Sequence, residues 1–159
     1  MALARGLTLR DDHAFEQRTA TILAILDDLG SPSLDDTGKA DALRRFHVEV
    51  DIGEAPLAIQ ARFRYLEWWS RDGRGWRLTK YQYDYFDRVL RSRLAYHRHH
   101  LAGEPDVLHI HCEPSGKPPS ARHFRAYEVD LLEAHEELAA LYVSGRAIDC
   151  AGLRPLRVD

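Results

Sequence analysis

Hydrophobic residues recur at helical spacing near both ends of the chain. The segment His13–Leu29 follows Asp11-Asp12, whose carboxylates suit a helix start, and it ends at Gly30-Ser31-Pro32, which stops a helix. A second apolar stripe at this spacing runs from Ala121 to Ser144. The sequence therefore predicts one long helix near each end, and a short extra helix is expected over Lys39–Arg45.

Between these helices the apolar and polar residues alternate, which is typical of strands with one buried face. Alternation covers Phe46–Ile52, Ile59–Trp69 and Trp76–Phe86, and Asp72-Gly73-Arg74-Gly75 holds an Asp-Gly hairpin signal between the last two. In the third segment the alternation predicts one face with Tyr81, Tyr83 and Tyr85, and the other face with Leu78, Lys80, Gln82, Asp84 and Phe86. Packing in the sheet is the favoured interpretation of these tyrosines, and a stacking platform for nucleic-acid bases is the alternative.

The segment Leu90–Glu113 predicts a second hairpin, with a polar loop around Gly103. It holds five of the nine histidines. Pairing centred near Gly103 places His97 opposite His109, and residues two apart on a strand point to the same side. We therefore expect four imidazoles on one face, and His100 on the other face or in the turn; the four are His97, His99, His109 and His111.

These elements predict an α+β fold in a single domain spanning residues 1–159. An antiparallel meander of about five strands packs with an N-terminal and a C-terminal helix, because each element has one apolar face to bury. Strands that follow one another without helical crossovers argue against a parallel sheet. The dinucleotide, P-loop, zincin and α/β-hydrolase motifs are missing from the sequence.

Composition indicates an ordinary folded domain rather than a membrane-spanning or secreted protein. Hydrophobic residues make up 45 % and charged residues 30 % of the chain, as in ordinary folded domains. No apolar run is long enough for a membrane span, and no secretion signal is evident. The two cysteines, Cys112 and Cys150, form no metal motif, so free thiols in a reducing cytoplasm are expected.

Charge is distributed unevenly along the chain. Residues 1–57 carry 6 basic and 11 acidic side chains, residues 58–125 carry 13 and 7, and residues 126–159 carry 3 and 7. The middle of the chain, which contains the histidine hairpin, is thus basic within a protein of net charge −3. A surface for nucleic acid is one interpretation; outward-facing arginines of an ordinary sheet are the other.

Three roles are open to the clustered histidines. They can hold zinc or another transition metal through His97, His99, His109 and His111. They can cleave RNA without a metal, one imidazole taking the 2′-hydroxyl proton and a second giving a proton to the leaving oxygen, with Arg93 and Arg98 stabilising charge on the phosphate. They can also be surface histidines with no chemistry.

The motifs of residues 57–113 resemble the TumE-type toxins of bacterial toxin–antitoxin pairs. Tyr81-Gln82-Tyr83 is similar to the YSY-like strand of that family, Arg93–His100 to its R-aromatic-D-N-A-P-H-H element, and His109-Ile110-His111 to its H-H-K-H-like element. The D-N-A-P core is absent, and the last element is shortened to HIH. The resemblance implies a toxin that acts on RNA and is neutralised by an antitoxin.

The sequence-based hypothesis is therefore a cytoplasmic, metal-independent endoribonuclease of the toxin type. Its expected partners are RNA and a cognate antitoxin, and no binding to a membrane is expected. The protein is also expected to be able to form a homodimer. The alternative is a non-catalytic binding or adaptor protein with a basic sheet, stabilised by a metal such as zinc on the histidines.

Overall fold

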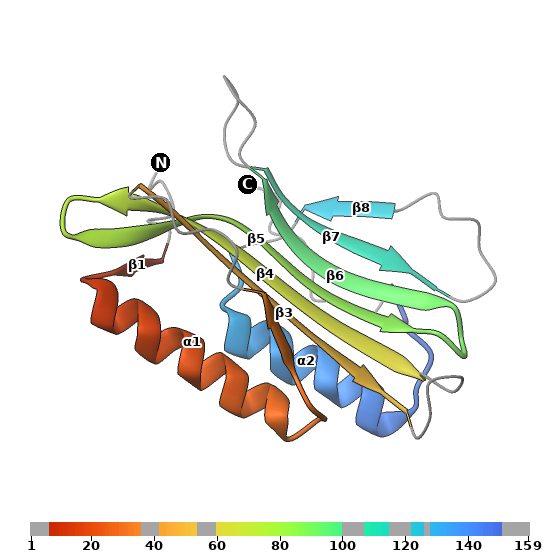
Figure 1. The fold of residues 1–159 in the computed structure, drawn as a ribbon. Coiled ribbons are helices and arrows are strands. Elements are labelled where there is room, and N and C mark those ends of the chain that lie inside the picture. Colours follow the sequence, from red (N-terminus) through yellow and green to blue (C-terminus); the bar gives the residue numbers. More distant parts are fainter. Residues whose placement is uncertain are drawn as a thin grey trace.

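The fold is built around one antiparallel sheet with both helices on the same face (Figure 1). The computed structural model describes residues 7–35, 42–53, 60–99, 107–114, 122–125 and 128–150. The sheet has eight strands in the order β2-β3-β4-β5-β6-β7-β8, and β1 pairs with the start of β5. The elements are β1 (Thr8–Leu9), α1 (Asp12–Asp27), β2 (Ser33–Asp35), β3 (Leu43–Ile52), β4 (Ala61–Asp72), β5 (Gly75–Asp87), β6 (Ser92–His99), β7 (Val107–Glu113), β8 (Arg122–Arg125) and α2 (Leu131–Ser144).

This architecture confirms the predicted α+β fold and its meander. Strands β3 to β7 are the five long ones, and each pairs with the next along the chain. The short strands β1, β2 and β8 extend this predicted five-stranded meander. Among the described residues no helix is long and apolar enough to cross a membrane.

Alternation divides the sheet into a covered face and an open face. One row of side chains crosses five strands in register on the covered face, and all of its members are buried: Val48, Tyr65, Tyr83, Tyr96 and Ile110. The helices close over this row. The Tyr65 hydroxyl lies 2.8 Å from His135 Nδ1 of α2, and the Tyr96 hydroxyl donates to Glu137 of the same helix.

The helix ends follow from their caps. The Asp11 carboxylate accepts a hydrogen bond from the Ala14 amide at 2.8 Å and starts α1, as the sequence predicts. Helix α2 is shorter than expected, because Asp130 caps it at Leu132 and residues 122–125 form a strand instead. The end of α2 at Gly145 has φ 59°, a left-handed conformation that glycine adopts without strain.

Two local predictions are wrong. Leu43–Arg45 open strand β3, so the part of the predicted helix over 39–45 that the structure describes is extended; residues 39–41 lie outside the described residues. Leu78 lies on the same face as the tyrosines rather than opposite them. The register shifts between Trp68 and Trp69, so that Trp68 pairs with Lys80 and Trp69 with Leu78. The extra residue in β5 reverses the alternation, and Leu78 enters the core.

The tyrosines of β5 pack in the core. Tyr81, Tyr83 and Tyr85 are at most 3 % exposed, and the rings of Tyr81 and Tyr83 stack with centroids 4.6 Å apart. Helices cover this face, so these rings do not offer a platform to bases. Sheet packing, the favoured interpretation of the sequence, is confirmed.

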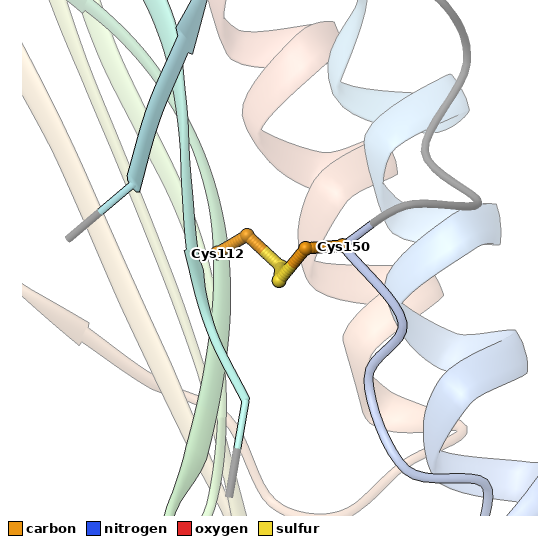
Figure 2. Close-up of a disulfide and its surroundings, with 2 residues drawn as sticks. All are labelled: Cys112 and Cys150. Atoms are coloured by element: carbon orange, nitrogen blue, oxygen red, sulfur yellow. A yellow bond between two sulfur atoms is a disulfide. The ribbon is translucent and has the colours of Figure 1, made fainter. Parts of the chain in front are cut away.

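The two cysteines form a disulfide, which corrects the expectation of free thiols. Cys112 of β7 is bonded to Cys150, which follows α2 (Figure 2). Their Cα atoms are 5.8 Å apart, within the range that a disulfide spans. Their separation of 38 positions in sequence gave no sign of this proximity, because it arises only when α2 returns across the sheet.

A buried ion pair fixes α1 to the covered face. Glu67 of β4 is 1 % exposed and lies among core side chains. Arg18 of α1 donates to both of its carboxylate oxygens, at 2.7 and 3.0 Å. The Tyr83 hydroxyl and the Trp69 indole N–H donate to the same carboxylate at 2.7 and 3.1 Å. The charge and its lone pairs are thus satisfied inside the core.

We expect Glu67→Gln and Arg18→Met each to reduce the free energy of unfolding by about 3 kcal/mol, because each leaves the other charge buried without its partner. Urea denaturation measures both losses. The double variant should lose clearly less than their sum, because the orphaned charge is then removed.

The exposed pair Arg77–Asp72 at the β4–β5 hairpin provides the matched control. Arg77→Met with Asp72→Asn should cost less than about 1 kcal/mol, since exposed ion pairs contribute little. Losses of this small size at Glu67 and Arg18 would show that the buried pair does not hold α1.

Reduction of the disulfide should lower the free energy of unfolding by about 4 kcal/mol, the loop-entropy value for a loop of this length. Denaturation with and without reductant measures the difference. The double variant Cys112→Ser with Cys150→Ser should respond to neither condition. Alkylation of thiols in intact cells before lysis reports whether the bond exists where the protein is made.

Candidate functional site

The open face of the sheet carries polar side chains in neighbouring register positions. His97 of β6 is directly opposite His109 of β7, as the sequence predicts. His111 is two residues further along β7 and is opposite Ala95. Asp84 of β5 is opposite Ala95 on its other side. Ala95, whose small side chain is fully buried, thus lies between Asp84 and His111 in the register.

Three imidazoles meet on this face, and we call them the histidine triad: His97, His109 and His111. The Nε2 atoms of His109 and His111 are 2.8 Å apart, within hydrogen-bond distance. The ring of His97 lies 4.4 Å from that of His111 and 5.2 Å from that of His109, between centroids. One ring nitrogen from each residue can be chosen so that all three lie within 4.8 Å of one another. His97 is buried, and the other two are partly exposed.

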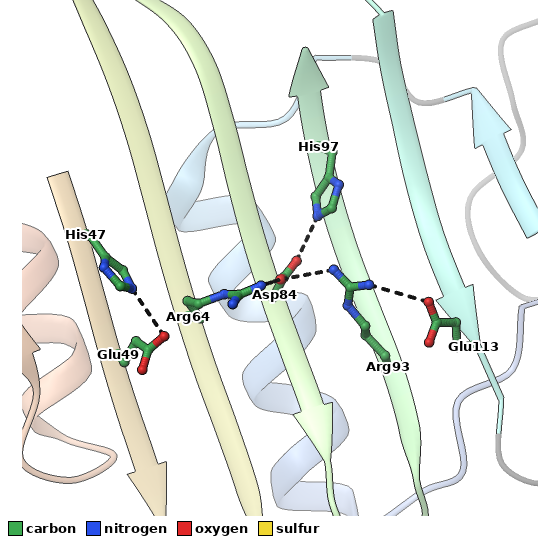
Figure 3. A network of polar contacts seen from close by, with 7 residues as sticks. All are labelled: His47, Glu49, Arg64, Asp84, Arg93, His97 and Glu113. Atoms are coloured by element: carbon green, nitrogen blue, oxygen red, sulfur yellow. Dashed lines mark hydrogen bonds and ion pairs between the residues drawn. The ribbon is translucent and has the colours of Figure 1, made fainter. Parts of the chain in front are cut away.

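Asp84 orients His97. Its Oδ1 lies 2.8 Å from His97 Nε2, and its Oδ2 accepts from Arg64 at 2.7 Å and from Arg93 at 3.1 Å (Figure 3). Burial by itself raises the pKa of Asp84, but the hydrogen bond with His97 and the charge of Arg93 outweigh burial and lower this pKa to about 2. An ionised carboxylate only accepts hydrogen bonds, so His97 carries a proton on Nε2. In neutral His97 the lone pair is then on Nδ1.

The two arginines predicted to bind phosphate lie on different faces. Arg93 is on the open face and links Asp84 to Glu113, whose Oε1 is 3.4 Å from it. Arg98 lies on the covered face, where it donates to Glu128 at 2.6 Å and is 7 % exposed. The expectation that both flank the histidines is corrected for Arg98, because it is one residue from His97 and so points to the other side.

Other histidines of the predicted cluster are placed only in part. His99 is opposite Val107 in the backbone register, at a position of the same parity as His97; its side chain lies outside the described residues, as does all of His100. His123 of β8 is opposite His111, a position that the sequence did not predict. Residues 122–125 show no alternation that would have separated this strand from the helix expected there.

The basic character of the middle of the chain is largely offset on this face. Arg62 donates to Asp51 at 2.6 and 2.8 Å, and Arg64 and Arg93 share Asp84. His47 of β3 lies 3.2 Å from Glu49, away from the triad (Figure 3). These pairs argue against a bare basic sheet, so the charge excess alone does not support a nucleic-acid or adaptor surface.

The arrangement supports two kinds of chemistry. A carboxylate that fixes the tautomer of an imidazole prepares it to exchange a proton at its other nitrogen. The same orientation is the one in which carboxylates support metal-binding histidines. The sequence predicted the three histidines but neither Asp84 nor Ala95, because a single carboxylate or alanine in an alternating strand gives no signal of its own.

We expect Asp84→Asn to remove a pH-dependent part of the stability. The folded-state pKa of about 2 is below the usual aspartate pKa of 3.8, so Asp84 stabilises the fold above about pH 4, and this contribution is lost as the pH falls through 2. The contribution is about 2 kcal/mol at neutral pH. Denaturation at a series of pH values should give a flatter curve below pH 4 for Asp84→Asn than for the unmodified chain.

Asp51→Asn is the matched control on the same face. Its hydrogen bonds with Arg62 lower the pKa of Asp51 too, but both side chains are more than a third exposed. Its loss should stay below about 1 kcal/mol. Equal losses for the two variants would mean that burial of Asp84 adds nothing.

Comparisons with protein-family models, with curated proteins and with solved structures found no match to this chain. The resemblance to TumE-type toxins therefore depends on the motifs of the sequence alone.

Proposed function

We propose that this protein is a toxin-like endoribonuclease of a bacterial toxin–antitoxin pair, which cleaves RNA at the histidine triad without a metal ion. The observation that carries the proposal is the meeting of three imidazoles on the open face, with Asp84 bonded to one of them. RNA supplies its own nucleophile, so the protein needs only to move two protons and to stabilise charge on one phosphate.

His97 is suited to the role of general base. Asp84 holds Nε2–H at 2.8 Å, which leaves the lone pair of neutral His97 on Nδ1. In this role Nδ1, which is buried in this structure, first becomes exposed to the RNA; it then takes the proton of the ribose 2′-hydroxyl while the 2′-oxygen attacks the adjacent phosphorus. Asp84 acts as a positioning residue, since it touches His97 and the two arginines rather than the reacting atoms.

The pair His109 and His111 is suited to the role of general acid. Two Nε2 atoms at 2.8 Å share one hydrogen bond, so a proton on one ring is stabilised by the lone pair of the other. This pair gives a proton to the 5′-oxygen as the bond between that oxygen and phosphorus breaks. The products are a 2′,3′-cyclic phosphate and a free 5′-hydroxyl. His97 then releases its proton and the His109–His111 pair takes one up, which restores the starting state.

Positive charge for the phosphate comes from Arg93, and from Arg64 beside it. Both guanidinium groups donate to Asp84, and the Arg64 side chain is 39 % exposed. A phosphate oxygen that replaces the Asp84 oxygen in one of these hydrogen bonds accepts from the same guanidinium N–H groups. Arg98 is not part of this proposal, because it lies on the covered face.

The partners and location belong to the same proposal. A toxin that cleaves RNA acts in the cytoplasm and is held inactive by an antitoxin until needed. The disulfide weighs against this location, because such bonds persist mainly in oxidising compartments. Thiol trapping in cells, as described above, tests this part separately from the chemistry.

Purified protein should cleave single-stranded RNA in the presence of EDTA and leave 2′,3′-cyclic phosphate ends. The double variant His109→Ala with His111→Ala should lower the cleavage rate at least about 100-fold, the usual contribution of acid–base catalysis. Gel analysis of a labelled RNA measures the rate, and mass spectrometry identifies the ends.

His47→Ala is the matched control, because His47 lies on the same face but pairs with Glu49 outside the triad. It should retain the full rate. Circular dichroism confirms that each variant is folded. Absence of cleavage by the folded unmodified protein on every RNA tested, or equal rates for the triad and control variants, would refute the proposal.

A further inference from the structure

We propose that the histidine triad binds a divalent transition-metal ion of the zinc class, and that the bound ion blocks acid–base catalysis. The binding half is independent of the proposed function. The inhibitory half rests on it, because only a catalytic triad can be inhibited.

The donor set selects the class of ion. Three neutral imidazoles on one patch suit zinc, copper or nickel, whereas calcium and magnesium prefer oxygen ligands. The carboxylate Asp84 contacts His97 through Oδ1, so its place is behind a ligand rather than among the ligands. Three histidines with a remaining position for water are a common zinc arrangement in proteins.

The spacing of the nitrogens is close to what a metal ion requires. Zinc–nitrogen bonds of about 2.0 Å in a tetrahedral site place the ligand nitrogens about 3.3 Å apart. The Nε2 atoms of His109 and His111 are 2.8 Å apart, and one nitrogen from each of the three rings can be chosen so that all lie within 4.8 Å of one another. The backbone is already held by strand pairing, with His97 directly opposite His109.

The hydrogen bond from His97 to Asp84 is typical of metal-binding histidines and is not expected in a chance cluster of histidines. Metal-binding histidines usually donate their other ring N–H to a carboxylate, which fixes the tautomer and the ring orientation. The Asp84–His97 hydrogen bond of 2.8 Å provides this contact and directs coordination to Nδ1. In Figure 3 this second nitrogen of His97 is on the side of β7, the strand of His109 and His111.

The surrounding charges are balanced. Arg64 and Arg93 lie beside the site, but Asp84 and Glu113 accept their hydrogen bonds. An incoming dication therefore does not meet an uncompensated group of positive charges among these residues. Asp84 is also held from three sides, which keeps His97 in place before the ion arrives.

The inhibitory half follows from the use of the same lone pairs. A nitrogen bound to a metal ion cannot accept or deliver a proton. Binding consumes the lone pair that makes His97 a base and those of the His109–His111 pair, so the metal-bound and catalytic forms exclude each other. An RNase of this kind would be silenced by zinc and released by a chelator.

Isothermal titration of the metal-free, oxidised full chain with zinc chloride should show one site with micromolar or tighter affinity. His111→Gln should weaken binding at least about 100-fold, and Asp84→Asn about 10- to 100-fold, as loss of a supporting carboxylate does elsewhere. His47→Gln is the matched control and should bind as tightly as the unmodified chain. Absence of saturable binding by the unmodified chain, or equal loss in the control, would overturn the binding half.

A second measurement needs no variant. Zinc should protect His109 and His111 from modification by diethylpyrocarbonate, as read by mass spectrometry, and should leave the exposed His13 reactive. Cobalt in place of zinc should give the intense visible bands of a four-coordinate site. Protection of all three histidines alike, or of none, would count against a site at the triad.

The inhibitory half is tested on the same samples. One equivalent of zinc should lower RNA cleavage at least about 10-fold, and EDTA should restore it. Tight binding with undiminished cleavage overturns inhibition alone. Binding by a chain that cleaves no RNA overturns the ribonuclease proposal and its inhibition while the metal site stands, so the failures are distinguishable.

Discussion

The bidentate contact between Arg18 and Glu67 determines how the covered face is assembled. A carboxylate that is 1 % exposed is tolerated in a core only when its charge and lone pairs are matched, and here a guanidinium, a hydroxyl and an indole N–H match them. The contact links α1 to β4, and the Tyr83 hydroxyl extends it to β5. An apolar residue at position 67 would leave Arg18, Tyr83 and Trp69 without this acceptor. The polar group thus specifies where the helix lies.

Asp84 is the counterpart of Glu67 on the open face, and the contrast explains where the site is. Both carboxylates are nearly buried, and both engage guanidinium groups. Glu67 accepts its other hydrogen bonds from the Tyr83 hydroxyl and the Trp69 indole N–H inside the core, and these bonds fix the packing there. Asp84 engages an imidazole whose neighbours, His109 and His111, are partly exposed. A matched buried carboxylate therefore stabilises packing on one face and orients the His97 imidazole on the other.

The sequence predicted what depends on local periodicity and missed what depends on register or long-range closure. Alternation sufficed for the strands, for the buried tyrosines and for His97 opposite His109, because a period of two fixes the face of each residue. It failed at Leu78, where one extra residue in β5 reverses the faces. The role expected of Arg98 did not follow the alternation, because Arg98 is next to His97 in β6 and so lies on the other face. The Cys112–Cys150 bond and the contact of Asp84 with His97 join separate strands or layers, so no local pattern records them.

The proposed proton transfer and the proposed metal binding use the same imidazole lone pairs. Each neutral imidazole of the triad has a single available lone pair, and the 2.8 Å contact between His109 and His111 already commits one of them to the other ring. A proton shared between the two rings therefore competes with a metal ion bound by all three imidazoles. Because the strand backbone holds the residues close in either case, neither state requires the fold to change. In this proposal the occupancy of the site is therefore set by the supply of metal ion rather than by refolding.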